Sequence, residues 1–194
     1  DDRGNKHDTE SCFRIVLVPT IINGRNDHEV GDIIKFAAEN IEVVRGINYQ
    51  PVAFTGAANP ENVKNERITI PDLLDRIEEQ TGGAIRKEHF YPVPCVVPIS
   101  DFAENYTGES QIRFTAHQHC GAATYGFVKD DGGLIAVNDM IDVDAFFAAI
   151  DKMTKKLDKA GHVKRYFTIL SGLKQIHSTL KEEEKSGKKK FWKL

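Results

Sequence analysis

A short apolar run, FRIVLV at residues 13–18, ends at Pro19 and constrains the fold more than any other feature of this chain. Its β-branched, nearly continuous apolar character is typical of a strand buried on both faces, as in a parallel sheet. Asp27 is expected to cap a following helix, and a second strand is expected over residues 47–54. The apolar residues that support this helix by their spacing are Ile33, Ile34, Phe36, Ala37 and Ile41. The sequence therefore predicts a βαβ unit with parallel strands and a right-handed crossover.

Ligands of parallel α/β units bind at the carboxyl ends of the strands. Here those ends are residues 19–26 and 50–55, and we expect a functional site there. The loop from Asn23 to Asp27 has the composition of a turn, with Gly24 available for a positive φ. Its polar groups could equally face a small polar ligand, so both interpretations stay open.

The rest of the chain adds a small β element and several helices. A helix is expected to begin after Thr69 and to end at Gly82, and the proline-rich residues 84–98 are expected to form an ordered loop or a site wall. An antiparallel meander is expected around the turn at residues 130–133. Its strands are expected at residues 111–117, 123–129 and 134–137. The other expected elements are a loop at residues 56–67 and helices at residues 143–157 and 166–180.

Composition and missing motifs exclude several classes of protein. The 194 residues include three cysteines and are 40% hydrophobic and 28% charged, which argues against a disulfide scaffold and against general disorder. No apolar run reaches the roughly 20 residues that span a bilayer, and the start does not resemble a signal peptide. The signatures G-x-G-x-x-G, Walker, G-x-S-x-G and H-E-x-x-H are absent. A reducing, cytoplasmic compartment is therefore expected.

The net charge of −3 hides a basic C-terminal part. Residues 151–194 contain 13 Lys and Arg against 5 Asp and Glu, a balance of +8. A solvated tail explains this lysine-rich end, and contact with an anionic membrane surface is the alternative. Trp192 beside the lysines suits a membrane surface. Nucleic acid is not an expected partner.

Cys95 and Cys120 are the residues best suited to metal ligation. Thiolate and imidazole are ligands of zinc and iron–sulfur sites, and His117 and His119 would share one face of a strand. No CxxC pair occurs, so two unrelated structural cysteines and two hydrogen-bonded histidines remain the alternatives. Cys12 is assigned no role.

Several segments, taken in order, resemble radical S-adenosylmethionine (SAM) enzymes, and most closely the archaeal branch that contains the tetraether lipid synthases. The matching segments are residues 16–20, 24–34, 45–52, 68–73, 78–83, 91–95 and 119–125. Together they cover the chain from about residue 13 to residue 150. Linked motifs in one order are more specific than any single motif.

The resemblance implies an α/β fold, the later half of a partial (β/α) barrel, followed by a small β-meander and C-terminal helices. It implies SAM bound beside a [4Fe–4S] cluster and cleaved to a 5′-deoxyadenosyl radical that acts on an unactivated carbon. The outcome would be coupling of lipid chains or, in relatives of the same branch, methyl transfer during pterin-cofactor assembly. The implied domains are a disordered or foreign leader (1–12), the barrel part (13–110), a β-hairpin with helices and an auxiliary cluster region (111–180), and a basic tail (181–194).

The resemblance also implies roles for individual residues. Asn26 would approach the polar end of SAM. The residues that would lie against the adenine are Gln50, Pro51 and Val52. Cys95 and Cys120 stand at the positions of the family's C-terminal cysteines and would be ligands of auxiliary clusters.

One departure from the family pattern is large. The CxxxCxxC loop that holds the SAM-cleaving cluster does not occur in the sequence. The chain is therefore expected to be part of a longer enzyme that acts on a lipid or other small molecule, and to be inactive alone. Its partner would be the missing N-terminal half, in the same chain or in a separate subunit, which would cover the edge of the half barrel. The alternatives are a non-catalytic binding piece and a small zinc module using His117, His119, Cys120 and Cys95.

Overall fold

The structure is a computed structural model that describes residues 14–56, 59–113, 116–117, 119–157, 172 and 177–180. The chain divides into two compact units, unit 1 (Asp1–Thr69) and unit 2 (Ile70–Leu194). The leader at residues 1–12 and the basic tail at residues 181–194 lie outside the described residues. Within the described part, no helix is both long and apolar enough to cross a membrane.

Unit 1 is built from two short parallel strand pairs and a helix between them. Strand β1 (Ile15–Leu17) pairs with β3 (Val44–Ile47), and β2 (Thr20–Ile21) pairs with β4 (Gln50–Pro51), both in parallel. Helix α1 (Val30–Glu39) follows the short 3₁₀ turn η1 (Asp27–Glu29). It lies in the sequence between β2 and β3, so both strand pairs are formed across this helix. The predicted parallel pairing across a helix is confirmed. A barrel built from these strands stays a prediction.

The core of unit 1 lies between α1 and the strands. Ile21 and Val30 are fully buried, and Val44 from β3 and Ala37 from α1 are buried as well. The Tyr49 hydroxyl donates a hydrogen bond to the Val30 carbonyl at 2.7 Å, and burial raises the pKa of this tyrosine. This bond ties the segment before β4 to the first turn of α1.

Three details of unit 1 differ from the sequence prediction. Strand β1 is not buried on both faces, because each sheet has two strands and the described residues leave Val16 56% exposed. Asp27 begins the 3₁₀ turn three residues before α1, and the N-cap position of that helix is Glu29. The loop predicted at residues 56–67 contains helix α2 (Pro60–Glu66), because the Asn59 side chain accepts the Glu61 N–H and Pro60 suits a first helical position.

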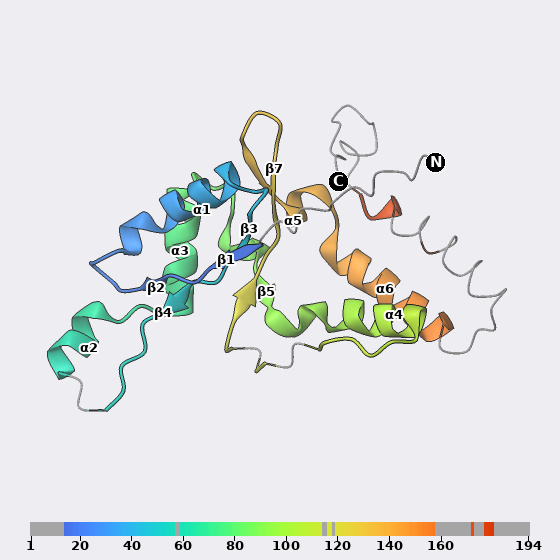
Figure 1. The fold of residues 1–194 in the computed structure, drawn as a ribbon, viewed down its shortest axis with the longest axis horizontal. Helices are drawn as coiled ribbons and strands as arrows, with labels where there is room; N and C mark the ends of the chain where they lie inside the picture. The colour runs from blue at the N-terminus through green and yellow to red at the C-terminus, as the bar shows by residue number, and fades with distance from the viewer. Residues whose placement is uncertain are drawn as a thin grey trace, which may run out of the picture. The chain divides into compact units, whose positions relative to one another are not determined.

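Unit 2 begins with helix α3 (Ile70–Gln80), which ends close to the predicted Gly82. Next come the 3₁₀ turn η2 (Lys87–His89), strand β5 (Tyr91–Pro92), the 3₁₀ turn η3 (Val93–Val96) and helix α4 (Val97–Thr107). Strands β6 (Ala122–Ala123), β7 (Gly126–Val128) and β8 (Leu134–Ala136) follow, then helices α5 (Val137–Met140) and α6 (Val143–Leu157). Helices α4 and α6 pack side by side (Figure 1).

The β element of unit 2 differs from the prediction, and the proline-rich segment, which was expected to be an ordered loop or a site wall, is helical at its end. β7 and β8 form the predicted antiparallel hairpin, but β6 pairs with β5 and does not extend a meander. No strand forms at residues 111–113 or 116–117, and the other predicted strand residues there lie outside the description. The proline-rich segment runs into helix α4, because Pro98 sits in the first turn, where its missing N–H costs nothing. The helix predicted at 166–180 falls largely outside the described residues.

Candidate functional site

Asn26 closes the loop at the end of strand β2. Its side-chain Oδ1 accepts the Ile22 N–H at 2.8 Å, and its Nδ2 donates to the Thr20 carbonyl at 2.9 Å. Gly24, with a φ of 71°, donates its N–H to the Asp27 carboxylate at 2.8 Å. The loop is therefore held by its own side chains, and the turn interpretation of its sequence accounts for these bonds.

The other three residues expected at the cofactor lie at the same strand end. Gln50 and Pro51 form β4, opposite Thr20 and Ile21 of β2, and the Val52 N–H donates to the Ile21 carbonyl at 2.9 Å. Since Asn26 bonds to both neighbours of Ile21, the structure brings all four candidates together at the carboxyl ends of two parallel strands. This is where ligands of α/β units bind.

Helix α2 is attached to the same loop. Asn23 donates its side-chain amide to the Asn65 carbonyl at 2.9 Å, and its backbone N–H donates to the Glu66 carbonyl at 3.0 Å. The Arg25 guanidinium pairs with the Glu66 carboxylate, with its Nε at 3.1 Å. These bonds hold the C-terminal end of α2 against the loop that follows β2.

The two cysteines of unit 2 flank the β5–β6 pair. The Val93 N–H donates to the Gly121 carbonyl at 3.2 Å, which extends the pairing of Pro92 with Ala122 by one residue. Cys95 lies two residues beyond Val93, and Cys120 immediately precedes Gly121. A Cβ on residue 121 would come within 3.1 Å of a Val93 methyl, so a glycine allows this close pairing.

The described residues do not form a complete metal site. Cys120 is exposed, and burial raises the pKa of the half-buried Cys95 thiol. The exposed rings of His117 and His119 lie 5.2 Å apart between centroids. Among described residues there is no group of three or more His, Cys, Asp or Glu side chains that could hold a metal ion. The zinc module therefore has no support here, and a [4Fe–4S] cluster would need further ligands.

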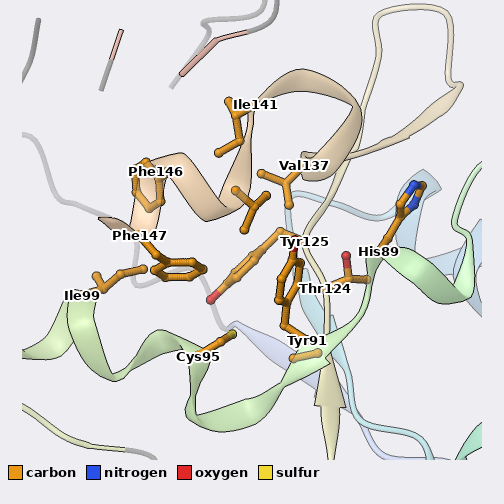
Figure 2. A pocket seen from close by; sticks show the side chains of 12 residues that line it. His89, Tyr91, Cys95, Ile99, Thr124, Tyr125, Val137, Ile141, Phe146 and Phe147 are labelled. Atoms are coloured by element: carbon orange, nitrogen blue, oxygen red, sulfur yellow. The ribbon is translucent and has the colours of Figure 1, made fainter. Parts of the chain in front are cut away.

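An apolar pocket that the sequence did not predict lies in unit 2, beside Cys95. It is lined by twelve residues from η2 through α6, and its volume is about 210 Å³. Figure 2 shows the rings of Tyr91 and Tyr125 near the middle, Phe147 and Ile99 on one side, and Thr124 on the other. The sequence predicted only a helix at residues 143–157, which contains the aromatic residues of α6, and no sequence motif marked the pocket.

His89 belongs to this pocket wall and is only 1% exposed. Its Nδ1 accepts the Arg86 N–H at 3.1 Å, which places the remaining ring proton of the neutral form on Nε2. Burial, then the positive charge of Arg86, lower the pKa of His89, and these effects outweigh the Asp139 carboxylate 3.6 Å from Nε2. His89 is therefore neutral at pH 7.

The stability of unit 2 should depend on the protonation of His89. Because the folded-state pKa lies below the unfolded value of about 6.5, the unfolded chain binds the proton first as the pH falls. The free energy of unfolding is thus unaffected above that pH and decreases below it, until His89 protonates in the folded state. Urea unfolding at pH 7.5 and 5.5 should show a smaller loss in His89→Gln than in the wild type. A loss in His89→Gln equal to that of the wild type would contradict the assignment.

Comparison with known proteins supports a relationship to an enzyme. No protein-family profile matches the chain. The chain is 49% identical over 156 residues to the 7,8-dihydro-6-hydroxymethylpterin dimethyltransferase of Methanocaldococcus jannaschii, a match that covers 78% of this chain and 31% of that protein. The chain is similar to a pterin methyltransferase. It spans about a third of the length of that relative.

This match supports the radical SAM relationship seen in the sequence, and with it SAM and a [4Fe–4S] cluster as the cofactors. It agrees with the methyl-transfer relatives named in that resemblance, and it gives no support to the tetraether lipid branch. Contact with a membrane likewise gains no support. Among the described residues, the carboxyl ends of two parallel strands lie together, but no complete set of cluster ligands is present.

Proposed function

We propose that this chain is part of a radical SAM methyltransferase that acts on a reduced pterin. The observation that carries the proposal is the 49% identity to a 7,8-dihydro-6-hydroxymethylpterin dimethyltransferase over most of the chain. The gathering of four candidate residues at one strand end is consistent with a cofactor site in unit 1. In the whole enzyme the bound cofactors would supply the radical chemistry, while the residues of this chain would orient the molecules and exclude water.

The proposed roles follow the strand-end geometry. Asn26 would present its loop to the polar end of SAM, and its two hydrogen bonds keep that loop in place. Gln50, Pro51 and Val52 would lie against the adenine. Cys95 and Cys120 would each contribute one thiolate to an auxiliary cluster whose other ligands lie beyond the described residues.

The parallel strands of unit 1 are proposed to belong to a partial (β/α) barrel. Parallel strands are nearly always covered on both faces, yet Ile15, Val16 and Val18 are 45%, 56% and 59% exposed. We propose that the remaining part of the enzyme covers these side chains. It would also carry the CxxxCxxC loop, in the same polypeptide or in a second subunit.

An anaerobic assay tests the proposed activity. The full-length protein that contains this chain, reconstituted with iron and sulfide, is incubated with SAM, a reductant and 7,8-dihydro-6-hydroxymethylpterin. We expect 5′-deoxyadenosine and a pterin carrying added methyl groups, both detected by mass spectrometry. Formation of 5′-deoxyadenosine without any methylated pterin would contradict the proposed substrate, and its absence would contradict the radical SAM chemistry. An archaeal lipid offered in place of the pterin tests the lipid-coupling alternative.

A further inference from the structure

We infer that the apolar pocket of unit 2 is where the bicyclic ring of the pterin binds, an inference that rests on the proposed function. The pocket lies within unit 2, between β5, the turn before β7 and helices α4 to α6 (Figure 2). No residue of this pocket was a candidate for SAM binding. One of its residues, Cys95, is a candidate cluster ligand.

The size and polarity of the pocket exclude SAM as its occupant. Its volume of about 210 Å³ is below the roughly 300–1,000 Å³ of sites for larger ligands, so it suits one compact ring system. SAM also carries a sulfonium, an ammonium and a carboxylate. No Asp, Glu, Lys or Arg side chain lines the pocket and its histidine is neutral, so burying the charges of SAM there without partners would cost several kcal/mol. The pocket is therefore suited to a neutral ring.

Aromatic side chains dominate the walls. Tyr91 from β5, Tyr125 before β7, and Phe146 and Phe147 from α6 all face the cavity. Phe146 and Phe147 meet edge to face, with centroids 5.6 Å apart, so one edge-on ring stabilises the other. A flat heteroaromatic ring between such walls gains both apolar burial and stacking.

One polar atom on the pocket wall lacks a hydrogen-bond partner within the described part of the chain. The Thr124 hydroxyl is buried and unbonded, and Thr124 lines the pocket. The His89 ring also belongs to the wall, but Figure 2 shows it turned away from the rings at the middle, and its Nε2 lies 3.6 Å from the Asp139 carboxylate.

Buried polar atoms are nearly always hydrogen-bonded, so the Thr124 hydroxyl calls for a partner. A purely apolar ligand such as a lipid chain would leave it unpaired, at a cost of about 1–3 kcal/mol. A pterin ring carries both N–H donors and nitrogen and oxygen acceptors on its edge. Its edge can therefore bond the Thr124 hydroxyl while its faces pack against the aromatic walls.

Tyr125 is the pocket residue best suited to substitution, because it lines the pocket and is 60% exposed. Truncating an exposed side chain disturbs folding little. Phe127, 41% exposed on β7 and absent from the pocket wall, is the matched control. Thr124→Val replaces the unbonded hydroxyl with a methyl group of similar shape, and Ala123→Leu fills the cavity from β6.

The experiment measures dissociation constants by anaerobic calorimetry on the full-length protein, with 7,8-dihydro-6-hydroxymethylpterin and SAM as separate probes. We expect Tyr125→Ala and Ala123→Leu to weaken pterin binding about tenfold or more, and Thr124→Val to weaken it several-fold. SAM affinity should stay within twofold of wild type in each variant, and Phe127→Ala should bind both probes normally.

The outcomes separate this inference from the proposed function. If wild-type protein methylates the pterin and Tyr125→Ala and Thr124→Val bind it as tightly as wild type, the pocket assignment is wrong and the function stands. If wild type binds SAM but no pterin, the proposed substrate and the pocket assignment both fail. Equal weakening by Phe127→Ala would show a general effect on unit 2 and would also overturn the assignment.

Discussion

Replacing Ile21 with alanine should lower the free energy of unfolding by about 2–5 kcal/mol, the range measured for emptying a buried aliphatic site. Ile21 is fully buried, and its carbonyl accepts the Val52 N–H that joins β2 to the end of β4. The cavity would open beneath the strand end where Asn26 and Gln50 lie. We therefore expect the variant to bind SAM more weakly as well as to unfold at lower urea concentration.

The control for this variant is Val18→Ala. Val18 lies three residues earlier in the same apolar segment, but it is 59% exposed, so its truncation should change the unfolding free energy by no more than about 0.5 kcal/mol. Urea titrations followed by circular dichroism measure both variants. Equal stability losses in the two would show that the packing assigned to Ile21 is wrong.

Replacing Cys95 or Cys120 with serine should remove the iron of one auxiliary cluster. The two residues flank the β5–β6 pair, and loss of either thiolate from a four-ligand cluster removes a strong bond that a serine hydroxyl does not replace. Iron and sulfide analysis of the anaerobically reconstituted full-length protein measures the effect. We expect the iron content to fall by one cluster while the iron of the SAM-cleaving cluster stays bound.

The third cysteine of the chain provides a matched control, because the sequence gives Cys12 no role. Cys12→Ser should retain all its iron. If Cys95→Ser and Cys120→Ser also keep the wild-type iron content, the two cysteines are structural residues and the cluster assignment is wrong. A loss in only one of the two would limit the ligand assignment to that residue.

The sequence predicted those parts of the fold that local chemistry determines. The parallel pairs of unit 1 followed from an apolar strand, an amphipathic helix and a second strand, and the hairpin of β7 and β8 followed from the turn residues Asp130 to Gly133. Helix α6 has the predicted limits because its apolar residues recur at helical spacing over fifteen residues. The two strand ends were expected at one edge because parallel strands bring their carboxyl ends together, whereas the four candidate residues there came from the resemblance to radical SAM enzymes.

The features that the sequence did not predict depend on contacts between residues that are far apart in the chain. The pairing of β5 with β6 joins Tyr91 to Ala123 across an intervening helix, and no local pattern marks it. The pocket needs residues from seven helices, turns and strands between His89 and Phe147, and the sequence of each of them alone is typical of an ordinary protein core. Helix α4 was missed because Pro98 was treated as a helix breaker, although its place in the first turn makes it compatible with a helix.

The boundary between Thr69 and Ile70 has a consequence for how such enzymes diverge. The four candidate SAM residues all lie before it, and the apolar pocket and both candidate cluster ligands lie after it. The two sets share no residue, and each lies within a compact unit of its own. Mutations that reshape the pocket therefore replace none of the residues at the strand end that would hold the cofactor. A lineage built on this chain could change its substrate while it inherits its cofactor site intact.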